Sequence, residues 1–338
     1  MTSRIGYIDN LKGFAIILVV LGHLIQYITV PDNYLNDGLW RWIYSFHMQL
    51  FVMISGMTVR TNLLNFNDLK TVVSRRFVQL IIPFIVWTVI FSLSFRDFSF
   101  IPKAIIDPGV GYWFLWDLFF ISISFSLAVV LHNQTRLNLL LSIGGVFLLL
   151  VLLSFLLGHR FDSGRIYRLF PFYVLGYYIS RFNLKTSQLG FLAGGIILHC
   201  FLAMFWFPSQ PSSSITPYPM INHFLSSLPY RLIVSLIGCI SYYALFKIIG
   251  GFFDNSWLNK FGKLTLGIYT FHLLAVRLSS QYIVFPRINN YLFQILMLVL
   301  LLVLFMFTSY FAISCLSKNR IMGLLFLGRI TPRLKKNN

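Results

Sequence analysis

The sequence predicts an all-α protein, a polytopic membrane helical bundle of about ten transmembrane helices with both termini in the cytoplasm. Composition is the first reason: 57% of the residues are apolar and 11% are charged, whereas average proteins have roughly 25% charged residues. The second reason is that the apolar residues form repeated runs long enough to cross a bilayer, where a helix satisfies its own backbone hydrogen bonds. The third is the placement of Lys and Arg, which lie mainly on alternate connections between the runs.

Ten apolar runs, separated by polar, basic or Pro/Gly-rich segments, define the predicted helices. With the N-terminus in the cytoplasm, about two thirds of the 27 Lys and Arg residues fall on the inner side, as the positive-inside rule requires. Residues 1–316 then form a membrane domain, and residues 317–338 form a basic cytoplasmic tail that contacts anionic lipid headgroups. The predicted spans are residues 13–30, 39–58, 77–95, 112–131, 139–157, 166–180, 189–207, 227–249, 264–284 and 291–316.

The net charge of +18 does not indicate a nucleic-acid-binding protein. Basic residues are scattered between apolar runs, whereas nucleic acid requires a basic patch on a soluble surface. The cysteines, Cys200, Cys239 and Cys315, lie inside apolar runs without metal-ligand spacing, so we expect no metal site. All nine acidic residues are aspartates, which leaves few candidates for carboxylate chemistry. Membrane lipids are therefore the expected partners of the basic residues.

The first span carries three polar residues along one stripe. On a helix, the eleven residues from Lys12 to His23 advance about three full turns, and Asp9 lies close to the same stripe. The axial rise between Lys12 and His23 is about 16 Å. If Lys12 lies at the headgroup boundary, His23 therefore lies near the middle of a hydrocarbon core about 30 Å thick. An ionisable group at that depth indicates a functional site.

Two further histidines are expected at a similar depth. His47 lies about 12 Å along the second span and His272 about 13 Å along the ninth, at about 1.5 Å per residue. Imidazole takes up and releases a proton near neutral pH, and it can act as a base when an alcohol attacks a carbonyl. The alternative is that these histidines hydrogen-bond between helices and serve packing alone. The sequence leaves both interpretations open.

Asp117 is a carboxylate within the fourth span, beside the aromatic residues Trp113 and Trp116. It either pairs with an arginine or hydrogen-bonds an acceptor substrate. The indole rings can stack on a sugar, although an aromatic belt at the membrane interface predicts the same residues. The arginines that qualify as partners are Arg168, Arg231 and Arg277.

Arg75 and Arg76 lie at the cytoplasmic start of the third span. Guanidinium groups bind phosphates through bidentate hydrogen bonds. Ordinary positive-inside anchoring explains the pair equally well.

Five motifs, in order along the chain, resemble those of the integral-membrane acyltransferase type 3 family, bacterial enzymes that O-acetylate cell-surface sugars. Each motif is weak alone, but together they extend over most of the chain. One position differs: the family often has Arg-x-x-Arg at the start of the third span, and here Arg76 is followed three residues later by Gln79. The motifs are residues 7–23, 46–56, 75–83, 113–115 and 267–272.

The resemblance implies a multi-pass enzyme of the bacterial inner membrane, with a membrane acyltransferase domain over residues 1–316. Its donor would be acetyl-CoA, or another acyl-CoA, that reaches in from the cytoplasm. Its acceptor would be a carbohydrate of the cell surface or a lipid-linked glycan. By position, His23 would be the catalytic histidine and Lys12 its cationic partner, while Arg75 and Arg76 would contact the phosphates of the donor.

These expectations combine into one predicted mechanism. Acyl-CoA docks near Lys12 and the two arginines and places its acyl group at His23. That histidine then acts as a general base, or as a transient acyl carrier, toward a sugar hydroxyl. Asp9 orients the cationic entrance with Lys12. The residues that complete the polar lining are His47, His272 and Tyr269, the last of which also contacts the substrate.

A transporter or flippase of lipid-linked sugars is the competing interpretation, with the buried histidines as a proton relay. The bundle and its buried ionisable groups favour it, and the order of the motifs and the lack of internal repeats disfavour it. A sensory or scaffold membrane protein is a third interpretation, which predicts no tight binding of CoA.

Overall fold

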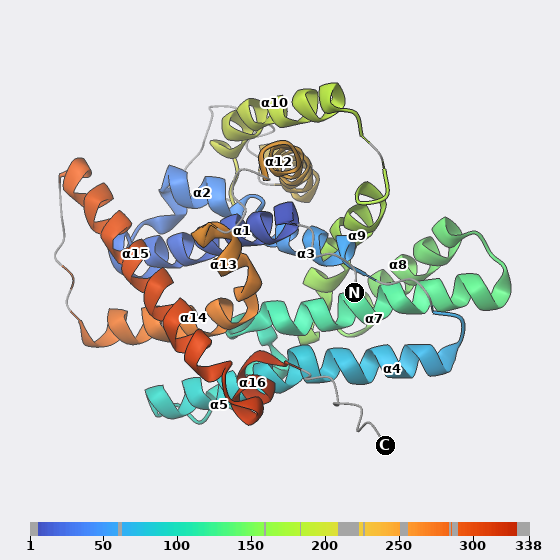
Figure 1. Cartoon of the computed structure of the whole chain (residues 1–338), viewed down its shortest axis with the longest axis horizontal. Coiled ribbons are helices and arrows are strands. Elements are labelled where there is room, and N and C mark those ends of the chain that lie inside the picture. Colours follow the sequence, from blue (N-terminus) through green and yellow to red (C-terminus); the bar gives the residue numbers. More distant parts are fainter. Residues whose placement is uncertain are drawn as a thin grey trace, which may run out of the picture. The chain divides into compact units, whose positions relative to one another are not determined.

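The computed structural model describes residues 6–59, 63–158, 160–182, 184–208, 223–225, 227–250, 256–283, 285 and 290–329. These residues form helices joined by turns, and no strand occurs among them (Figure 1). The predicted all-α class is therefore confirmed. The chain divides into two compact units. The first unit is Met1–Ile54 with Ser180–Phe311, and the second is Ser55–Ile179 with Ala312–Asn338.

The first unit joins the start of the chain to its later half. Asp37 begins the short helix α2, because its carboxylate accepts a hydrogen bond from the backbone N–H of Trp40 at 2.7 Å, as an N-cap residue does. The helices α3 and α15 cross the boundary between the units. The elements are α1 (Gly6–Leu24), the π-helical turn η1 (Ile25–Thr29), α2 (Gly38–Tyr44), α3 (His47–Met57), α10 (Thr186–Ala203), α12 (Leu228–Ile249), α13 (Trp257–Lys263), α14 (Thr265–Tyr282) and α15 (Tyr291–Leu316).

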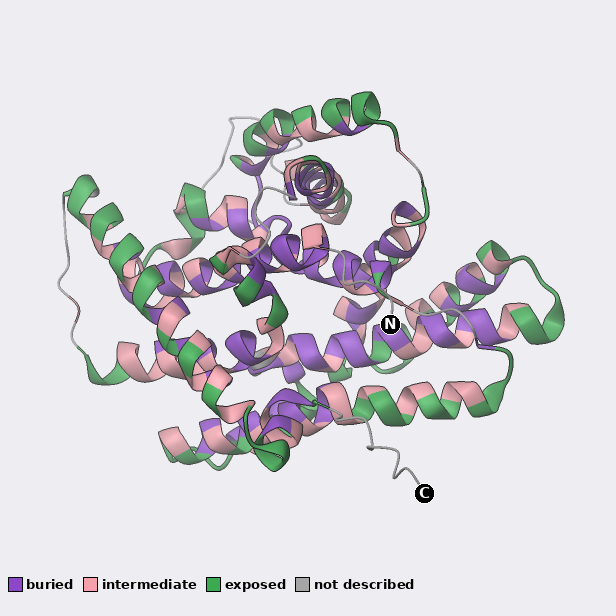
Figure 2. Ribbon diagram, viewed as in Figure 1, coloured by how far each residue is buried: buried purple, intermediate pink, exposed green. Residues whose placement is uncertain are grey.

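Helix α1 is the buried centre of the first unit, and α13 lies directly against it (Figures 1 and 2). Two glycines permit this approach. A Cβ atom on Gly13 would overlap the backbone of Leu258, and one on Gly262 would overlap the backbone of Asp9. The close backbone separation at these two contacts is therefore available to glycine and to no larger residue.

Helix α14 runs parallel to α1 within the same unit. Successive contacts along the two helices show this. Gly262, just before α14, lies against Asp9 near the start of α1. His272 contacts His23 further toward the C-terminal end of both helices. Arg277 contacts Tyr27 beyond that. The polar residues of the two helices therefore meet in register.

The second unit contains a hairpin of two apolar helices, α7 and α8, with α4 and α9 packed on α7. The short helix α16 packs on α5, where Nε1 of Trp87 donates a hydrogen bond of 3.0 Å to the carbonyl oxygen of Phe326. The elements are α4 (Phe66–Arg76), the π-helical turn η3 (Phe77–Ile81), α5 (Ile82–Phe95), α6 (Phe100–Ile106), η4 (Pro108–Val110), α7 (Trp113–Thr135), α8 (Leu139–Leu156), η5 (Arg160–Asp162), α9 (Ser163–Ile179) and α16 (Arg320–Leu327).

The helix that carries the third predicted span begins earlier than the sequence predicts. A capping box of Asn65 and Asp68 starts it, and helix continues from Phe66 to Phe95. Pro83 is the second residue of α5, which follows directly after the π-helical turn η3. Proline supplies no backbone N–H, so a break in the regular hydrogen-bond ladder at this point fits its chemistry.

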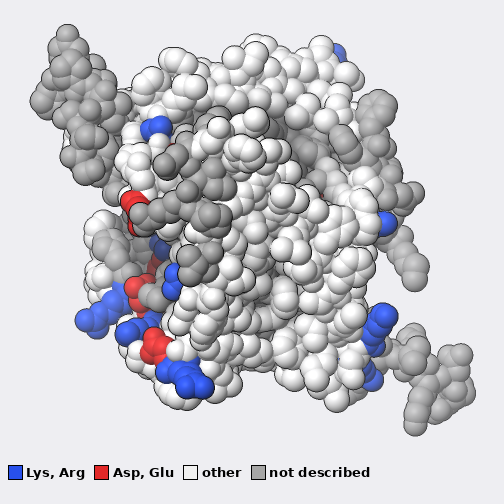
Figure 3. Space-filling model, turned by 90° about the vertical axis from the view of Figure 1, so that its left-hand side faces the viewer, with Lys and Arg blue, Asp and Glu red and all other residues white. Residues whose placement is uncertain are grey.

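Among the described residues, seven helical segments are long and apolar enough to cross a membrane. Helices α8, α10 and α15 leave much of their apolar surface exposed (Figure 2), which fits contact with lipid. The face drawn in Figure 3 is largely free of charged side chains, and those present gather in small areas. The segments are Gly6–Thr29, Phe66–Phe95, Trp113–Thr135, Leu139–Leu156, Thr186–Ala203, Leu228–Ile249 and Leu292–Leu316.

Three predicted spans correspond to shorter or more polar helices. The run 39–58 is divided at Ser45 into α2 and α3. The run 166–180 becomes α9, with 17 residues, and the run 264–284 becomes α14, with 18 residues. About ten spans therefore remains a prediction, as does the cytoplasmic location of both termini. Residues 330–338 of the predicted tail lie outside the described residues.

Candidate active site

Two histidines from opposite ends of the sequence meet in the first unit. Nδ1 of His23, in α1, lies 2.9 Å from Nε2 of His272, in α14. Their rings stack with 5.1 Å between centroids and 22° between planes. The side chain of His272 is fully buried, whereas His23 is half-buried. His23 is therefore the member of the pair that a substrate can reach.

Hydrogen-bond chemistry fixes the protons of this pair. Nδ1 of His272 lies 2.8 Å from the carbonyl oxygen of Ile268, and a carbonyl only accepts, so this Nδ1 carries a proton. In a neutral ring Nε2 of His272 then holds a lone pair, and it accepts the hydrogen bond from Nδ1–H of His23. Nε2 of His23 is left with a lone pair of its own. With both rings neutral, His23 is the base, and His272 orients it.

His47 lies near the pair without a hydrogen bond to it among the described residues. Its Nδ1 donates a hydrogen bond of 2.7 Å to the carbonyl oxygen of Ile43, so its Nε2 also holds a lone pair when the ring is neutral. The ring of Tyr44 bridges the two histidines, because it meets the ring of His47 at 4.8 Å and the ring of His23 at 6.5 Å. The structure therefore collects all three predicted histidines in one unit.

The other predicted site residues of the first unit lie at different distances from the histidine pair. Lys12 is half-buried and precedes His23 by three turns of α1. Asp9 is buried beneath α13. The ring of Tyr269 lies 6.0 Å from the ring of His272 and is buried beside it. Tyr269 therefore belongs to the surroundings of the pair, and Asp9 and Lys12 lie toward the N-terminal end of α1.

Sequence reasoning missed an aromatic wall beside His23. The ring of Tyr27 stacks on His23 at 5.8 Å, and the ring of Trp40 stacks on Tyr44 at 3.9 Å. Arg277, which the sequence offered as a partner for Asp117, places its guanidinium group 4.7 Å from the centre of the Tyr27 ring. A helical spacing signal was present, because Tyr27 follows His23 by four residues and shares its helix face.

The predicted phosphate-binding arginines line a cavity in the second unit. Arg75 and Arg76 close the end of α4, and Nη1 of Arg76 lies 3.4 Å from Oε1 of Gln79. The cavity has a volume of about 520 Å³, which is within the usual range for small-molecule sites of roughly 300–1,000 Å³. Its lining includes Thr58, Val59, Leu63, Val72, Arg75, Arg76, Gln79 and Ser126.

A π-helical turn follows His23 in the first unit and the arginines Arg75 and Arg76 in the second. Helix α1 changes to η1 two residues after His23, and α4 changes to η3 directly after Arg76. Single π-helical turns are uncommon and frequently lie at functional sites. The two π-helical turns therefore support a functional role for His23 and for the two arginines, independently of the chemistry of their side chains.

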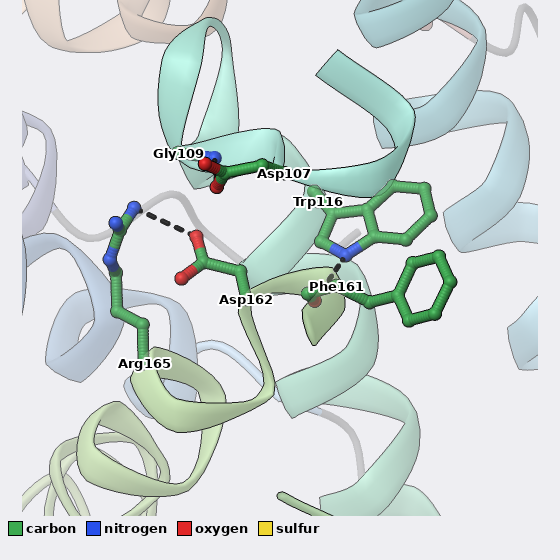
Figure 4. A network of polar contacts seen from close by, with 6 residues as sticks. All are labelled: Asp107, Gly109, Trp116, Phe161, Asp162 and Arg165. Carbon is green, nitrogen blue, oxygen red and sulfur yellow. Dashed lines mark hydrogen bonds and ion pairs between the residues drawn. The ribbon is translucent and has the colours of Figure 1, made fainter. Parts of the chain in front are cut away.

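Asp117 lies in the second unit and is fully buried. Neither of its carboxyl oxygens has a hydrogen-bond partner among the described residues, and the charged groups that act on it are those of Asp162, Arg165 and Arg168. Asp162 also pairs with Nη1 of Arg165 at 2.8 Å (Figure 4). Burial raises the pKa of Asp162, and the charge of Arg165 opposes that rise. The ion pair beside Asp117 is thus made by Arg165, which the sequence had not singled out, while the charge of Arg168, which the sequence had, also acts on Asp117.

The two tryptophans near Asp117 have partners of their own. The guanidinium group of Arg165 lies 4.1 Å from the centre of a Trp113 ring. Nε1 of Trp116 donates a hydrogen bond of 3.1 Å to the carbonyl oxygen of Phe161 (Figure 4). Phe161 and Asp162 both have positive φ angles, of 56° and 58°, a conformation that costs a residue with a side chain roughly 1–2 kcal/mol. These contacts hold the turn η5 against α7.

In the described part of the chain, no three His, Cys, Asp or Glu side chains gather in a way that could hold a metal ion.

The family model described as "Acyltransferase domain" matches residues 5–316 of the chain. Nodulation protein NolL of Sinorhizobium fredii (strain NBRC 101917 / NGR234) is 38% identical over 118 residues, 32% of this chain and 32% of that protein. Nodulation protein NolL of Mesorhizobium japonicum (strain LMG 29417 / CECT 9101 / MAFF 303099) is 34% identical over 145 residues, 39% of this chain and 37% of that protein. The chain therefore covers about a third of the length of these relatives. No solved structure is significantly similar to it.

Proposed function

The chain belongs to this acyltransferase family, and we propose that it is a membrane O-acyltransferase, which moves an acyl group from acyl-CoA to a hydroxyl of a cell-surface or lipid-linked sugar. The observation that carries the proposal is the histidine pair. It leaves a lone pair on Nε2 of His23, which is the histidine at the matching position of the family's first motif. We further propose acetyl-CoA as the donor and the bacterial inner membrane as the location.

In the proposed reaction, Nε2 of His23 takes the proton from the acceptor hydroxyl as its oxygen attacks the thioester carbonyl. The tetrahedral intermediate then collapses, the bond from carbon to sulfur breaks, and CoA leaves as the thiol after it takes the proton from His23. Nδ1–H of His23 stays hydrogen-bonded to His272 throughout. That hydrogen bond is stronger while His23 is cationic. His272 therefore stabilises the imidazolium form that His23 adopts between the two proton transfers.

The proposed donor contacts are Arg75, Arg76 and Lys12. The first two supply guanidinium groups to a cavity of suitable size, and guanidinium binds phosphate oxygens in a bidentate manner. Gln79 takes the place where the family often has a second arginine, and it contributes an amide that can also donate to phosphate. Asp9 orients the entrance of the donor together with Lys12.

The proposed acceptor contacts are Asp117, Trp113, Trp116 and Tyr269. The support for Asp117 is its buried carboxyl group, whose oxygens have no hydrogen-bond partner among the described residues, since carboxylates accept hydrogen bonds from sugar hydroxyls. Tyr269 lies beside His272, and its phenol can donate to a hydroxyl of the acceptor or accept from it. His47 adds a second imidazole near the base.

The test is a His23→Ala variant that is produced and inserted in the membrane at the level of the native protein. We expect acyl transfer from radiolabelled acetyl-CoA to membrane glycans to fall by a factor of roughly 10²–10⁴, the usual contribution of a general base. His199→Ala is a matched control, because His199 is also buried in the first unit but bonds Ser45 at 3.0 Å instead of the pair. Undiminished transfer by the His23 variant would contradict the assignment.

A transporter with a histidine proton relay is less well supported. His23 is hydrogen-bonded to His272, but the Nδ1–H groups of His272 and His47 donate to the backbone carbonyls of Ile268 and Ile43, and an amide carbonyl does not pass a proton onward. Purified protein in detergent separates the two functions, because an acyltransferase hydrolyses acetyl-CoA or transfers its label and a transporter does neither.

A further inference from the structure

Arg277 lies one turn beyond the histidine pair, on the side away from Lys12. Because α1 and α14 run parallel, the contact of Arg277 with Tyr27 follows the contact of His272 with His23 in the same direction along both helices. Lys12 precedes His23 by about 16 Å of helix. A donor that enters along the Lys12 end of α1 therefore leaves the Arg277 end for the other substrate.

The guanidinium group of Arg277 has no carboxylate partner among the described residues. It lies over the face of the Tyr27 ring, 4.7 Å from the ring centre, and both residues are half-buried. The sequence predicts that α14 lies in the membrane, where an arginine is costly unless it is paired or reaches water, and such residues generally belong to substrate pathways. A cation–π contact offsets part of this cost but does not neutralise the charge.

Tyr27 connects the arginine to the base. Its ring stacks on His23 at 5.8 Å with 28° between planes, so Tyr27 contacts both the imidazole of His23 and the guanidinium group of Arg277. Tyr44 borders this surface, and its hydroxyl donates a hydrogen bond of 2.9 Å to Oε1 of Gln26. Aromatic faces beside polar groups are a suitable surface for a sugar ring.

We propose that Tyr27 and Arg277 bind an anionic group, a phosphate or a carboxylate, that the acceptor glycan carries, and that they thereby hold its hydroxyl at His23. This inference rests on the proposed acyl transfer at His23. It names the chemical class of the acceptor, an acidic glycan or a glycan linked to a lipid through phosphate. It also assigns Tyr27 and Arg277 as acceptor-binding residues, which the motifs of the sequence did not indicate.

The experiment uses the purified full-length protein in lipid vesicles, radiolabelled acetyl-CoA, and glycolipid from the source organism separated by anion exchange into neutral and acidic fractions. We expect the native protein to acylate the acidic fraction at least tenfold more efficiently. In Arg277→Gln, KM for the acidic fraction should rise roughly 10- to 100-fold, the usual worth of a hydrogen bond to a charged group, while KM for acetyl-CoA stays constant. Arg277→Lys should retain part of the preference.

The matched control is Arg41→Gln. Arg41 is also a half-buried arginine of the first unit, with its guanidinium group 4.6 Å from the centre of the Phe207 ring, and its substitution should leave both KM values unchanged. Mild acid treatment of the labelled product separates the two sources, because it cleaves a sugar from a lipid phosphate and leaves a uronic acid glycoside intact.

Each contrary result identifies what is wrong. Equal acylation of neutral and acidic glycolipid, or an unchanged KM for the acceptor in Arg277→Gln, would overturn the inference and leave the acyltransferase assignment in place. A rise in KM for acetyl-CoA in that variant would assign Arg277 to the donor phosphates instead. Absence of transfer by the native protein to either fraction would overturn the proposed function itself.

Discussion

At the scale of single residues, the histidine pair assigns different tasks to two side chains of the same type. The carbonyl oxygen of Ile268 fixes the proton of His272 on Nδ1, and that choice leaves Nε2 of His23 as the open base. The sequence predicted that both histidines reach the same depth, because depth follows from position along a helix. It could not predict which ring would be the base, since that depends on a hydrogen bond between residues 249 positions apart.

The positioning role of His272 predicts a difference between two substitutions. His272→Gln keeps an oxygen that can accept from Nδ1–H of His23, whereas His272→Leu removes the acceptor. We expect the leucine variant to lose roughly 10- to 100-fold in kcat, as follows from a lost hydrogen bond to a charged group, and the glutamine variant to lose less. KM for acetyl-CoA should stay constant in both. Equal activity of the leucine variant and the native protein, with the protein properly inserted, would contradict the role.

At the scale of elements, the contact between α1 and α13 holds the N-terminal part of the first motif, including Asp9 and Gly13, against α13. The first predicted span corresponds to a helical segment, Gly6–Thr29, that is long and apolar enough to cross a membrane. No pattern in the sequence indicated that a helix of seven residues, α13, would lie against it, since that contact joins distant parts of the chain. The π-helical turns η1 and η3 could not be predicted either. A π-helical turn contains one residue more than an α-helical turn, and the spacing of apolar residues does not reveal that difference.

Gly262 tests this contact. A methyl group there would overlap the backbone of Asp9, and backbone cannot move aside as a side chain can. We expect Gly262→Ala to lower stability by about 1–3 kcal/mol, the usual cost of overpacking, measured as the midpoint of thermal unfolding in detergent. Gly194→Ala in α10 is the control, because a Cβ atom there meets nothing within 4 Å, and alanine is the better helix former. A Gly262 variant as stable as the Gly194 variant would show that α13 can move away without cost.

At the scale of the whole molecule, composition predicted the membrane class and motif order predicted the family, and the family is confirmed by the match over residues 5–316. The division into two units could not be predicted, because each unit combines distant segments of the chain. Arg75 and Arg76 share a cavity with Ser126, and a motif gives no information about such a partner. Helix length and hydropathy do not establish the predicted spans with His47 and His272, nor the run 166–180.

The C-terminal segment offers a test at this scale. The sequence predicts a basic tail that contacts lipid, whereas α16 also packs on α5 and its Phe326 carbonyl accepts from Trp87. Truncation after Ser317 removes both contributions, and Lys318→Gln with Arg320→Gln removes charge alone. We expect truncation to lower the unfolding midpoint by several degrees, because buried Leu327 is lost with α16, and the charge variant to leave it nearly unchanged. Equal midpoints for the truncated and native chains would show that α16 contributes nothing to the second unit.

The separation of His23 and His272 along the chain sets the order in which the site is made. Synthesis proceeds at roughly 5–20 residues per second, so the 249 positions between them correspond to about 12–50 s. During that interval α1 is already made, while α13 and α14, which cover it in the mature protein, do not yet exist. The imidazole of His23 therefore acquires its orientation late in biogenesis. A chain released before α14 is made contains His23 but lacks His272, the residue that orients it.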